Sequence, residues 1–233
     1  MRLNKYLSEH TLLSRRKADI AIAEGRVAVN GNMPQVGQQV TNEDSVELDG
    51  RNVNSSKATE KIIIILLNKP IGYVCSKNGQ GSRTVYSLLP KEYQRLNIAG
   101  RLDKDSSGLV VLTNDGELLN ELTHPSNNKK KIYEVIVDKE LSEQDIELLK
   151  TGVEIGEKIP SKFVSIARSK LEVTHPSSLI PETYTYEVVL QEGRNRQIRK
   201  MLNKLHVSVE SLHRKSMGQF SSDGLNKSKY KII

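Results

Sequence analysis

Residues 100–109 form the stretch of this chain that is best equipped for chemistry. They carry two carboxylates, Asp103 and Asp105, together with two bases and two serines, and they lie between apolar stretches. A polar insert between two buried elements is a typical place for a functional site on a rigid scaffold. On one strand the two carboxylates would face the same side about 6.7 Å apart, and paired acids at such separations can act on a glycosidic bond. The alternative is a charged turn capped by serine and glycine.

The composition argues against a carbohydrate polymer as the substrate of these acids. A cleft for such a polymer is usually lined by aromatic side chains, whereas this chain has no Trp and 4% aromatic residues. Chemistry at the glycosidic carbon of another kind of substrate therefore stays open.

Other reactive residues show no pattern of a metal or nucleotide site. The five histidines lack the HxH, HxxxH and HExxH spacings that would bring two ligands together. Cys75 is the only cysteine, and we expect it to be a small buried apolar residue. Neither GxGxxG nor the phosphate-binding pattern GxxxxGKS/T occurs in the chain. The sequence therefore predicts neither a metal nor a cofactor.

The positive charge of the chain is concentrated in two segments far apart in the sequence. The formal net charge is +7. Residues 194–215 contain seven bases and one acid, and residues 1–26 contain six bases and three acids. Residues 27–50 contain four acids and no base. This distribution favours a polyanion that the protein contacts at two places, and the alternative is a pair of solvated helix faces.

The composition also limits the class of protein. With 36% hydrophobic and 27% charged residues in 233 positions, the chain fits a soluble globular protein of one or two domains. One cysteine excludes a disulfide scaffold. The longest apolar run, residues 62–67, is far shorter than the roughly 20 residues that cross a bilayer. The first residues lack the apolar core of a signal peptide, so we expect a cytoplasmic protein without membrane contact.

The elements that position these residues are expected to form two domains. In residues 1–50, a helical pattern and Ser14 as the N-cap of a second helix predict a small helical unit. A tight-turn signal at Asn30-Gly31 predicts a small sheet after it. Residues 51–60 are polar and rich in Ser and Asn, which predicts a linker. The second domain would then span residues 61–233.

The second domain is expected to alternate short strands with a few helices. Strands are predicted at residues 62–67, 132–137 and 184–190 from their β-branched or alternating patterns. Helices are predicted over residues 141–150 and after Gly193. This order predicts an α+β fold with a mixed, mostly antiparallel sheet, and not a regular βαβ repeat.

Five motifs, taken in their order, resemble those of the RsuA-like family of bacterial ribosomal RNA pseudouridine synthases. The matching stretches are residues 2–48, 67–73, 100–109 continued by 112–116, 131–133 and 193–201. The resemblance covers nearly the whole chain, and it implies an S4-type RNA-binding domain followed by a larger catalytic domain. It implies conversion of a uridine in structured ribosomal RNA, most closely large-subunit RNA, to pseudouridine. One departure is the C-terminus, which lacks the Trp-containing segment with which family members commonly end.

The resemblance also implies a catalytic set of three residues. Asp103 matches the essential aspartate, which would attack an extruded uridine at C1′ of the ribose or, in an older scheme, at C6 of the ring. Arg199 matches the arginine that pairs with this aspartate, and such a pair lowers the pKa of a carboxyl. Tyr133 would stack on the target base, with Ile198 packed against it. The family reaction needs no cofactor and no metal.

Two sets of RNA-binding residues follow from the same resemblance. Arg101 would fill the space left by the extruded nucleotide, and the alternative is a surface ion pair with Asp105 or Asp115. The set implied for the catalytic domain is Arg101, Lys131, Arg194, Asn195, Arg196, Gln197 and Ile198. The set implied for the S4 domain is Arg2, Lys5, Arg15, Arg16, Lys17 and Arg26.

Two other functions are weighed beside this one. The first is a non-catalytic S4-type RNA-binding or ribosome-assembly factor, against which the intact catalytic set argues. The second is a hydrolase that would release free uracil. In each case we expect a monomer, and the sequence does not name the target uridine.

Overall fold

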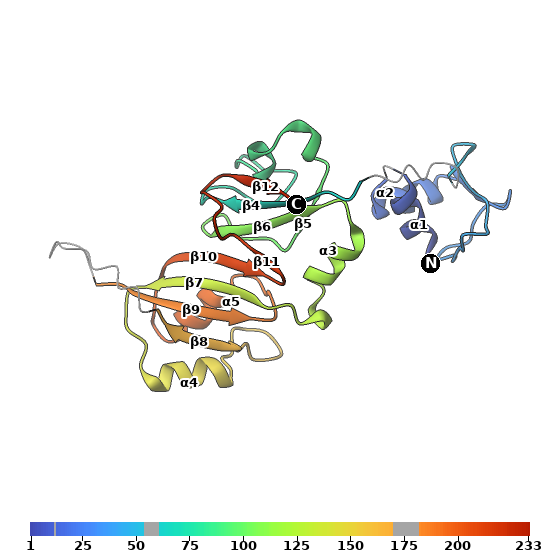
Figure 1. Cartoon of the computed structure of the whole chain (residues 1–233). Helices are drawn as coiled ribbons and strands as arrows, with labels where there is room; N and C mark the ends of the chain where they lie inside the picture. The colour runs from blue at the N-terminus through green and yellow to red at the C-terminus, as the bar shows by residue number, and fades with distance from the viewer. Residues whose placement is uncertain (12, 54–60, 170–181) are drawn as a thin grey trace. The chain divides into compact units, whose positions relative to one another are not determined.

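The computed structural model describes residues 1–11, 13–53, 61–169 and 182–233 (Figure 1). The chain divides into two compact units, Met1–Lys61 and Ile62–Ile233. Each unit has a hydrophobic core of its own.

Unit 1 consists of two helices and a small antiparallel sheet. Its elements are α1 (Leu3–His10), α2 (Arg15–Ala23), β1 (Val27–Val29), β2 (Val46–Leu48) and β3 (Arg51–Asn52), with strand order β1-β2-β3. Ser14 is the N-cap of α2, as predicted, because its side chain accepts a hydrogen bond from the backbone N–H of Lys17. Asn30 and Gly31 both have positive φ, at 51° and 77°, which is the backbone of the predicted tight turn.

The linker expected at residues 51–60 begins later than predicted. Arg51 and Asn52 form β3, which pairs with β2, and Val53 is 4% exposed in the core of unit 1. A short edge strand of polar residues has the same composition as a linker. Composition alone therefore could not distinguish the two, which explains the error. Residues 54–60 lie outside the described residues.

Unit 2 is built on one large sheet with helices beside it (Figure 1). Its main strands are β4 (Ile64–Lys69), β5 (Asn97–Ala99), β6 (Ser107–Thr113), β7 (Lys131–Val137), β8 (Ser165–Arg168), β9 (Tyr184–Leu190), β10 (Val209–Met217), β11 (Phe220–Ser221) and β12 (Tyr230–Ile232). The order is β12-β4-β6-β10-β7-β9-β8, with β5 against β6 and β11 against β10. Within the described residues, β6 and β10 form the one parallel pair. The predicted α+β fold with a mixed, mostly antiparallel sheet is confirmed.

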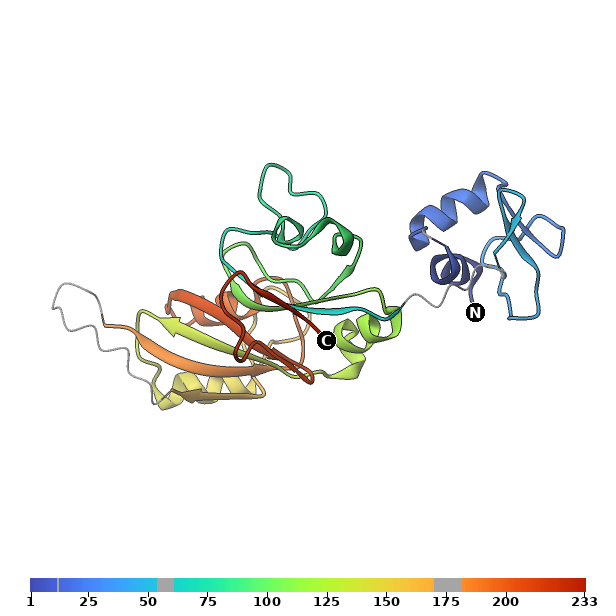
Figure 2. The same ribbon diagram turned by 45° about the horizontal axis from the view of Figure 1, so that its top comes forward.

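Both faces of the sheet are covered around β4 and β6. Ile65 and Leu67 belong to the main core, together with the short 3₁₀ turns Val85–Leu88 and Lys91–Tyr93. Leu66 lies on the opposite face, in a cluster that includes Leu118 and Leu122 of α3 (Gly116–Thr123). Figure 2 shows the turns that follow β4 and the helix α3 on opposite sides of the sheet. This double burial explains the continuous apolar run of β4.

Two further helices pack on the half of the sheet that contains β7 and β9. The helix α4 (Glu143–Thr151) starts with a capping box between Ser142 and Asp145. The helix α5 (Gln197–Asn203) buries Ile198, Met201 and Leu202 in the main core. The helix predicted after Gly193 is thus confirmed, with its apolar residues at helical spacing.

Strand β12 lies at one edge of the sheet. β12 pairs with β4, from Tyr230 opposite Leu67 to Ile232 opposite Ile65, and the ring of Tyr230 meets that of Tyr93 edge to face. None of the helices in the described parts of the chain has the length and apolar character needed to cross a bilayer. The same parts contain no group of three or more side chains placed to hold a metal ion.

Candidate active site

Asp103 lies on a loop that joins β5 to β6, and not on a strand. Its side chain is 34% exposed. The loop turns back on itself, because the N–H of Ser106 donates to the carbonyl oxygen of Asp103 (3.2 Å). It also contacts the segment that follows β4, where the N–H of Gly72 donates to the carbonyl oxygen of Lys104 (2.7 Å). The strand geometry assumed for Asp103 and Asp105 is therefore wrong, and the loop is a braced turn.

A buried lysine is hydrogen-bonded to the backbone of this loop. Lys69, at the end of β4, is 0% exposed, and its Nζ donates to the carbonyl oxygens of Ser106 (2.5 Å) and Pro70 (3.0 Å). Burial lowers the pKa of the Lys69 ammonium, and the nearby carboxylates of Asp105 and Asp103 oppose that shift. A buried cation is thus hydrogen-bonded to the backbone of the loop that carries both acids.

A buried arginine holds the two ends of the same loop. Arg214 of β10 is 1% exposed. Its Nη2 donates to the carbonyl oxygen of Gly100 and its Nε to that of Leu109, both at 2.8 Å. Gly100 has φ +74°, and an added Cβ would lie 2.7 Å from Cε of Met217. The ends of the loop are therefore fixed against the middle of the sheet.

Two arginines, the N-cap of α5 and a residue of its first turn, converge on Asp105. The guanidinium of Arg196 donates to both carboxylate oxygens of Asp105, at 3.1 and 2.8 Å, and lies 4.0 Å from the carboxylate of Asp103. Arg199 donates to the carbonyl oxygens of Asp105 (3.1 Å) and Val209 (2.9 Å), and its Nε is 3.4 Å from the Asp105 carboxylate. The ion pair predicted between Arg199 and Asp103 is therefore not the one observed. Arg196, the N-cap of α5, has φ +51°, so the chain makes a left-handed turn three positions before Arg199.

The Asp105 carboxyl is expected to titrate at unusually low pH. The hydrogen bonds from Arg196 lower its pKa despite partial burial. The carboxylate then favours the folded state above the ordinary pKa of about 3.9, and that contribution is lost as the pH falls through the lowered value. Carbon-detected NMR titration should show the low midpoint in the wild type and a higher one in Arg196→Gln.

Lys150→Gln serves as the control for this titration. Lys150 is exposed on α4, and its loss removes one positive charge without touching the loop. An unchanged midpoint in Arg196→Gln would contradict the assigned pairing. The effect on stability should be small, because the Asp105 side chain is 45% exposed.

One buried apolar cluster includes a residue of the loop and residues of two distant elements. Tyr133 of β7 is 7% exposed and Ile198 of α5 is 3% exposed. Both belong to this cluster with Leu102, which directly precedes Asp103 on the loop. That Tyr133 and Ile198 line a pocket at Asp103 stays a prediction.

Arg101 is exposed on the same loop. Neither Asp105 nor Asp115 pairs with it: Asp105 is held by the two arginines, and Asp115 caps α3 through hydrogen bonds from Glu117 and Leu118. The alternative of a surface ion pair is thus not observed among the described residues.

Three residues of unit 2 that were expected to bind RNA are buried or bind other side chains of the protein. Lys131 is 8% exposed, and burial lowers the pKa of its ammonium. Arg194 pairs with Glu192 (2.9 Å) and Glu157 (3.4 Å). Gln197 is 4% exposed and also hydrogen-bonds to Glu192. Arg194 and Gln197 hold the segment before α5 through Glu192. Asn195 and Arg196 are exposed, and the guanidinium of Arg196 pairs with Asp105.

The basic segment 194–215 therefore does not form one charged surface. Arg214 is buried, and Lys215 pairs with Glu187 at 2.9 Å. Charge counting could not separate these residues, because a base on a half-buried strand and a base on a helix face contribute equally to the sum.

In unit 1, the basic residues at the start of α2 are exposed. Arg15, Arg16 and Lys17 have no ion pair within the part of the chain that the structure describes. In contrast, Arg26 donates to both carboxylate oxygens of Asp49, each at 2.7 Å. Lys5 lies 3.5 Å from Glu9 on α1. The first turn of α2 is thus the clearest candidate of this unit for contact with an anion.

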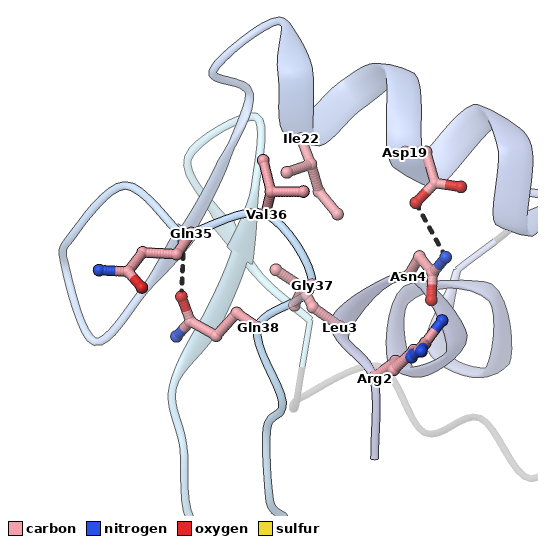
Figure 3. A pocket seen from close by; sticks show the side chains of 9 residues that line it. All are labelled: Arg2, Leu3, Asn4, Asp19, Ile22, Gln35, Val36, Gly37 and Gln38. Carbon is pink, nitrogen blue, oxygen red and sulfur yellow. Dashed lines mark hydrogen bonds between the residues drawn. The ribbon is translucent and has the colours of Figure 1, made fainter.

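Arg2 borders a recess of about 280 Å³ in unit 1 (Figure 3). On one side of the recess Asn4 donates to Asp19 (2.8 Å). On the other, the backbone N–H of Gln35 donates to the side chain of Gln38 (2.9 Å). The recess is polar at its rim, and Arg2 has no carboxylate partner among the described residues.

Sequence reasoning missed the functional weight of Lys69, Gly108 and Arg214. For Lys69 and Gly108 the signal was a charge or a glycine beside an apolar strand run, which marks either solvent exposure or a buried backbone contact. Arg214 lies in a polar stretch with His213 and Lys215, so it carried no such signal. The structure decides for the buried contact in all three.

Comparison with known proteins agrees with this architecture and defines the class as an enzyme that modifies RNA. Residues 63–204 match the RNA pseudouridylate synthase family, and residues 1–46 match the S4 domain. The chain is 35% identical over 225 residues to the dual-specificity RNA pseudouridine synthase RluF of Escherichia coli strain K12, across 97% of this chain and 72% of that protein.

Two further similarities support the same class. Ribosomal large subunit pseudouridine synthase B of Pseudomonas aeruginosa is 36% identical over 220 residues, across 93% of this chain and 55% of that protein. A crystal structure of a pseudouridylate synthase aligns with all of this chain and 96% of its own, at 28% identity and a TM-score of 0.67. The chain belongs to the RNA pseudouridylate synthase family, as an RsuA-like member with an N-terminal S4 domain.

Proposed function

We propose that this protein converts a specific uridine of ribosomal RNA, in the large subunit, to pseudouridine, with Asp103 as the nucleophile on a flipped-out nucleotide. The name of the Pseudomonas aeruginosa relative supports a substrate in large-subunit ribosomal RNA, and that of RluF supports an RNA substrate. The observation that carries the proposal is the braced loop, which presents a partly exposed carboxylate directly after Leu102 of the main core cluster. We further propose that the protein acts as a monomer in the cytoplasm.

The reaction exchanges one bond to the ribose for another. Asp103 attacks C1′, or C6 of the ring in the alternative scheme, and the bond between C1′ and N1 breaks. The detached uracil turns, a bond forms between C5 and C1′, and the carboxylate leaves again. The proton on C5 is lost and N1 gains one, so uridine and pseudouridine are isomers. A carboxylate suits this task because it can both add and depart.

Basic side chains lie around the loop that carries the proposed nucleophile. The guanidinium of Arg196 lies 4.0 Å from the Asp103 carboxylate, and the buried ammonium of Lys69 donates to the backbone of the same loop. In this proposal Arg199 acts through Asp105, since its contacts fix the part of the loop that follows the nucleophile.

We expect two functions in the reaction for the core cluster that contains Leu102, Tyr133 and Ile198. Tyr133 offers an aromatic face for the uracil, and Ile198 and Leu102 lie in the same cluster. Base stacking on an aromatic ring is worth about 1–3 kcal/mol. Exclusion of water would also protect the detached uracil and the ribose from hydrolysis.

When a uridine is extruded, another group must fill the space that its base leaves in the RNA stack. Arg101 is two residues before Asp103, is exposed, and has no ion pair among the described residues. Its guanidinium is therefore free to enter the vacated space and to contact the flanking phosphates. The exposed Asn195 and Arg196 would contact the same RNA segment.

Pseudouridine mapping tests the proposal directly. RNA from cells with and without the gene is mapped at single-nucleotide resolution, and one site in large-subunit ribosomal RNA should lose its pseudouridine. The purified protein should restore that site on RNA from the deletion strain. A non-catalytic assembly factor would leave every site modified, and a hydrolase would release free uracil, which chromatography detects.

Charge reversal at the start of α2 should weaken RNA binding. Arg15 and Arg16 are exposed and have no ion pair among the described residues, so we propose that they contact phosphates. In Arg15→Glu/Arg16→Glu the affinity for ribosomal RNA should fall, and the slope of log K against log salt should become shallower by about 2. Filter binding over a range of salt concentrations measures both quantities.

A matched pair of reversals controls for the change in net charge. Lys139→Glu/Lys150→Glu changes two exposed lysines of unit 2 and should leave the salt slope near that of the wild type. Equal losses in both double variants would show that only the total charge matters, which would refute a specific contact by α2.

A further inference from the structure

Arg214 is an arginine that the protein buries against its own backbone. It is 1% exposed, and its hydrogen bonds go to the carbonyl oxygens of Gly100 and Leu109. Within residues 1–11, 13–53, 61–169 and 182–233, no carboxylate forms an ion pair with it. Burying a positive charge without a carboxylate partner costs free energy. The position therefore requires a property of arginine that a neutral side chain lacks.

The planar guanidinium is the feature that fits the position. Its N–H donors diverge in fixed directions, so one side chain can reach two acceptors at once. Nε and Nη2 each lie 2.8 Å from a different carbonyl oxygen. The ammonium of a lysine is a point charge on a flexible stem and would not hold both carbonyls in this geometry.

The two carbonyls bracket the loop of Asp103. Gly100 directly follows β5, and Leu109 lies in β6. The backbone of Arg214 is itself held in place, because β10 is in the middle of the sheet between β6 and β7. The register pairs Arg214 with Gly108, so the guanidinium starts from a backbone that is itself fixed to the strand after the loop.

We infer that Arg214 is a positioning residue for the reaction, which sets the place of the Asp103 carboxylate by fixing both ends of its loop. The inference rests on the proposed function. Lys69 supports the middle of the loop through Ser106, whereas Arg214 determines the distance between its ends. Because Arg214 is buried, this role is separate from any contact between RNA and the exposed bases of residues 194–204.

The test compares Arg214→Lys and Arg214→Met with the neighbouring Lys215→Met in the full-length protein. Lys215→Met removes the same charge from the same strand, at a half-exposed residue paired with Glu187. The readouts are the single-turnover rate on transcribed large-subunit ribosomal RNA, the Kd for that RNA, and amide hydrogen exchange of residues 100–109. Near-UV circular dichroism reports the fold.

Both Arg214 variants should lose about 100-fold in single-turnover rate, the size of effect expected from a displacement of about 1 Å at a reacting group. The Kd should stay near the wild-type value, and exchange should accelerate in residues 100–109 alone. Lys215→Met should match the wild type in all three readouts.

Three results would overturn the inference. The first is an Arg214→Lys rate within about twofold of the wild type. The second is a loss of RNA affinity that accounts for the loss of rate. The third is a global loss of the near-UV signal in Arg214→Lys, which would assign Arg214 to the stability of the whole sheet. A wild-type protein without activity on any ribosomal RNA would instead refute the proposed function.

Discussion

Asp103→Asn should abolish pseudouridine formation while RNA binding persists. The amide has nearly the shape of the carboxylate but is not a nucleophile, so the step at C1′ or C6 cannot begin. Loss of a residue that carries the covalent step removes nearly all of the catalysis, by a factor on the order of 10⁴ or more. The measurement is a purified single-turnover assay with mass mapping of the product, together with the Kd for the same RNA.

Asp223→Asn is the matched control for this substitution. Asp223 is exposed and lies on the turn after β11, so the same chemical change there should leave both rate and affinity unaltered. An active Asp103→Asn protein would refute the assigned nucleophile. Equal loss of RNA binding and activity would instead make Asp103 a binding residue.

Gly108→Ala should cost both stability and activity. Gly108 has φ +108°, and an added Cβ would lie 2.3 Å from the carbonyl oxygen of Arg214 and 2.5 Å from its nitrogen. Those atoms belong to β10, the strand paired in parallel with β6, and cannot yield without breaking the sheet. Strain and overpacking together should lower the free energy of unfolding by about 3 kcal/mol or more.

Gly116→Ala provides the comparison for this prediction. Gly116 begins α3, and nothing lies within 4 Å of a Cβ added there. Alanine favours a helix over glycine by about 1 kcal/mol in a helix interior, so this variant should equal or exceed the wild type in stability. Chemical denaturation measures both variants. A Gly108→Ala protein as stable as the wild type would contradict the close approach of β6 and β10.

Local patterns were sufficient for most elements of the fold. The alternation around residues 132–137 predicted β7, and Ser142 predicted the start of α4, because strand faces and helix caps depend on residues close in sequence. The continuous apolar run predicted a strand with two buried faces, which β4 is. Strand order was beyond reach, since pairing of β6 with β10 joins residues about 100 positions apart.

The position of the acidic loop was predictable, whereas its pairing was not. Composition singled out residues 100–109, but Asp103 and Asp105 are equivalent in any charge count. Which of them receives the arginines depends on the left-handed turn at Arg196, with φ +51°. A non-glycine residue adopts that conformation only when its surroundings support it, so the sequence alone could not select Asp105.

The buried cations show that a base in the sequence need not be a surface charge that binds RNA. Lys69 and Arg214 look like surface charges in a sequence, yet both are almost fully buried and bind backbone carbonyls of the same loop. Their function is visible only once β4 and β10 are known to lie on either side of β6. The loop that carries the proposed nucleophile is thus held by two buried residues.

A structure of the Asp103→Asn protein bound to its ribosomal RNA segment would test the central proposal most directly. The proposal predicts an extruded uridine whose C1′ or C6 lies within about 3.5 Å of the side chain at position 103, with its base against Tyr133. A target uridine that stays stacked in the RNA, or that binds away from the loop between β5 and β6, would contradict it.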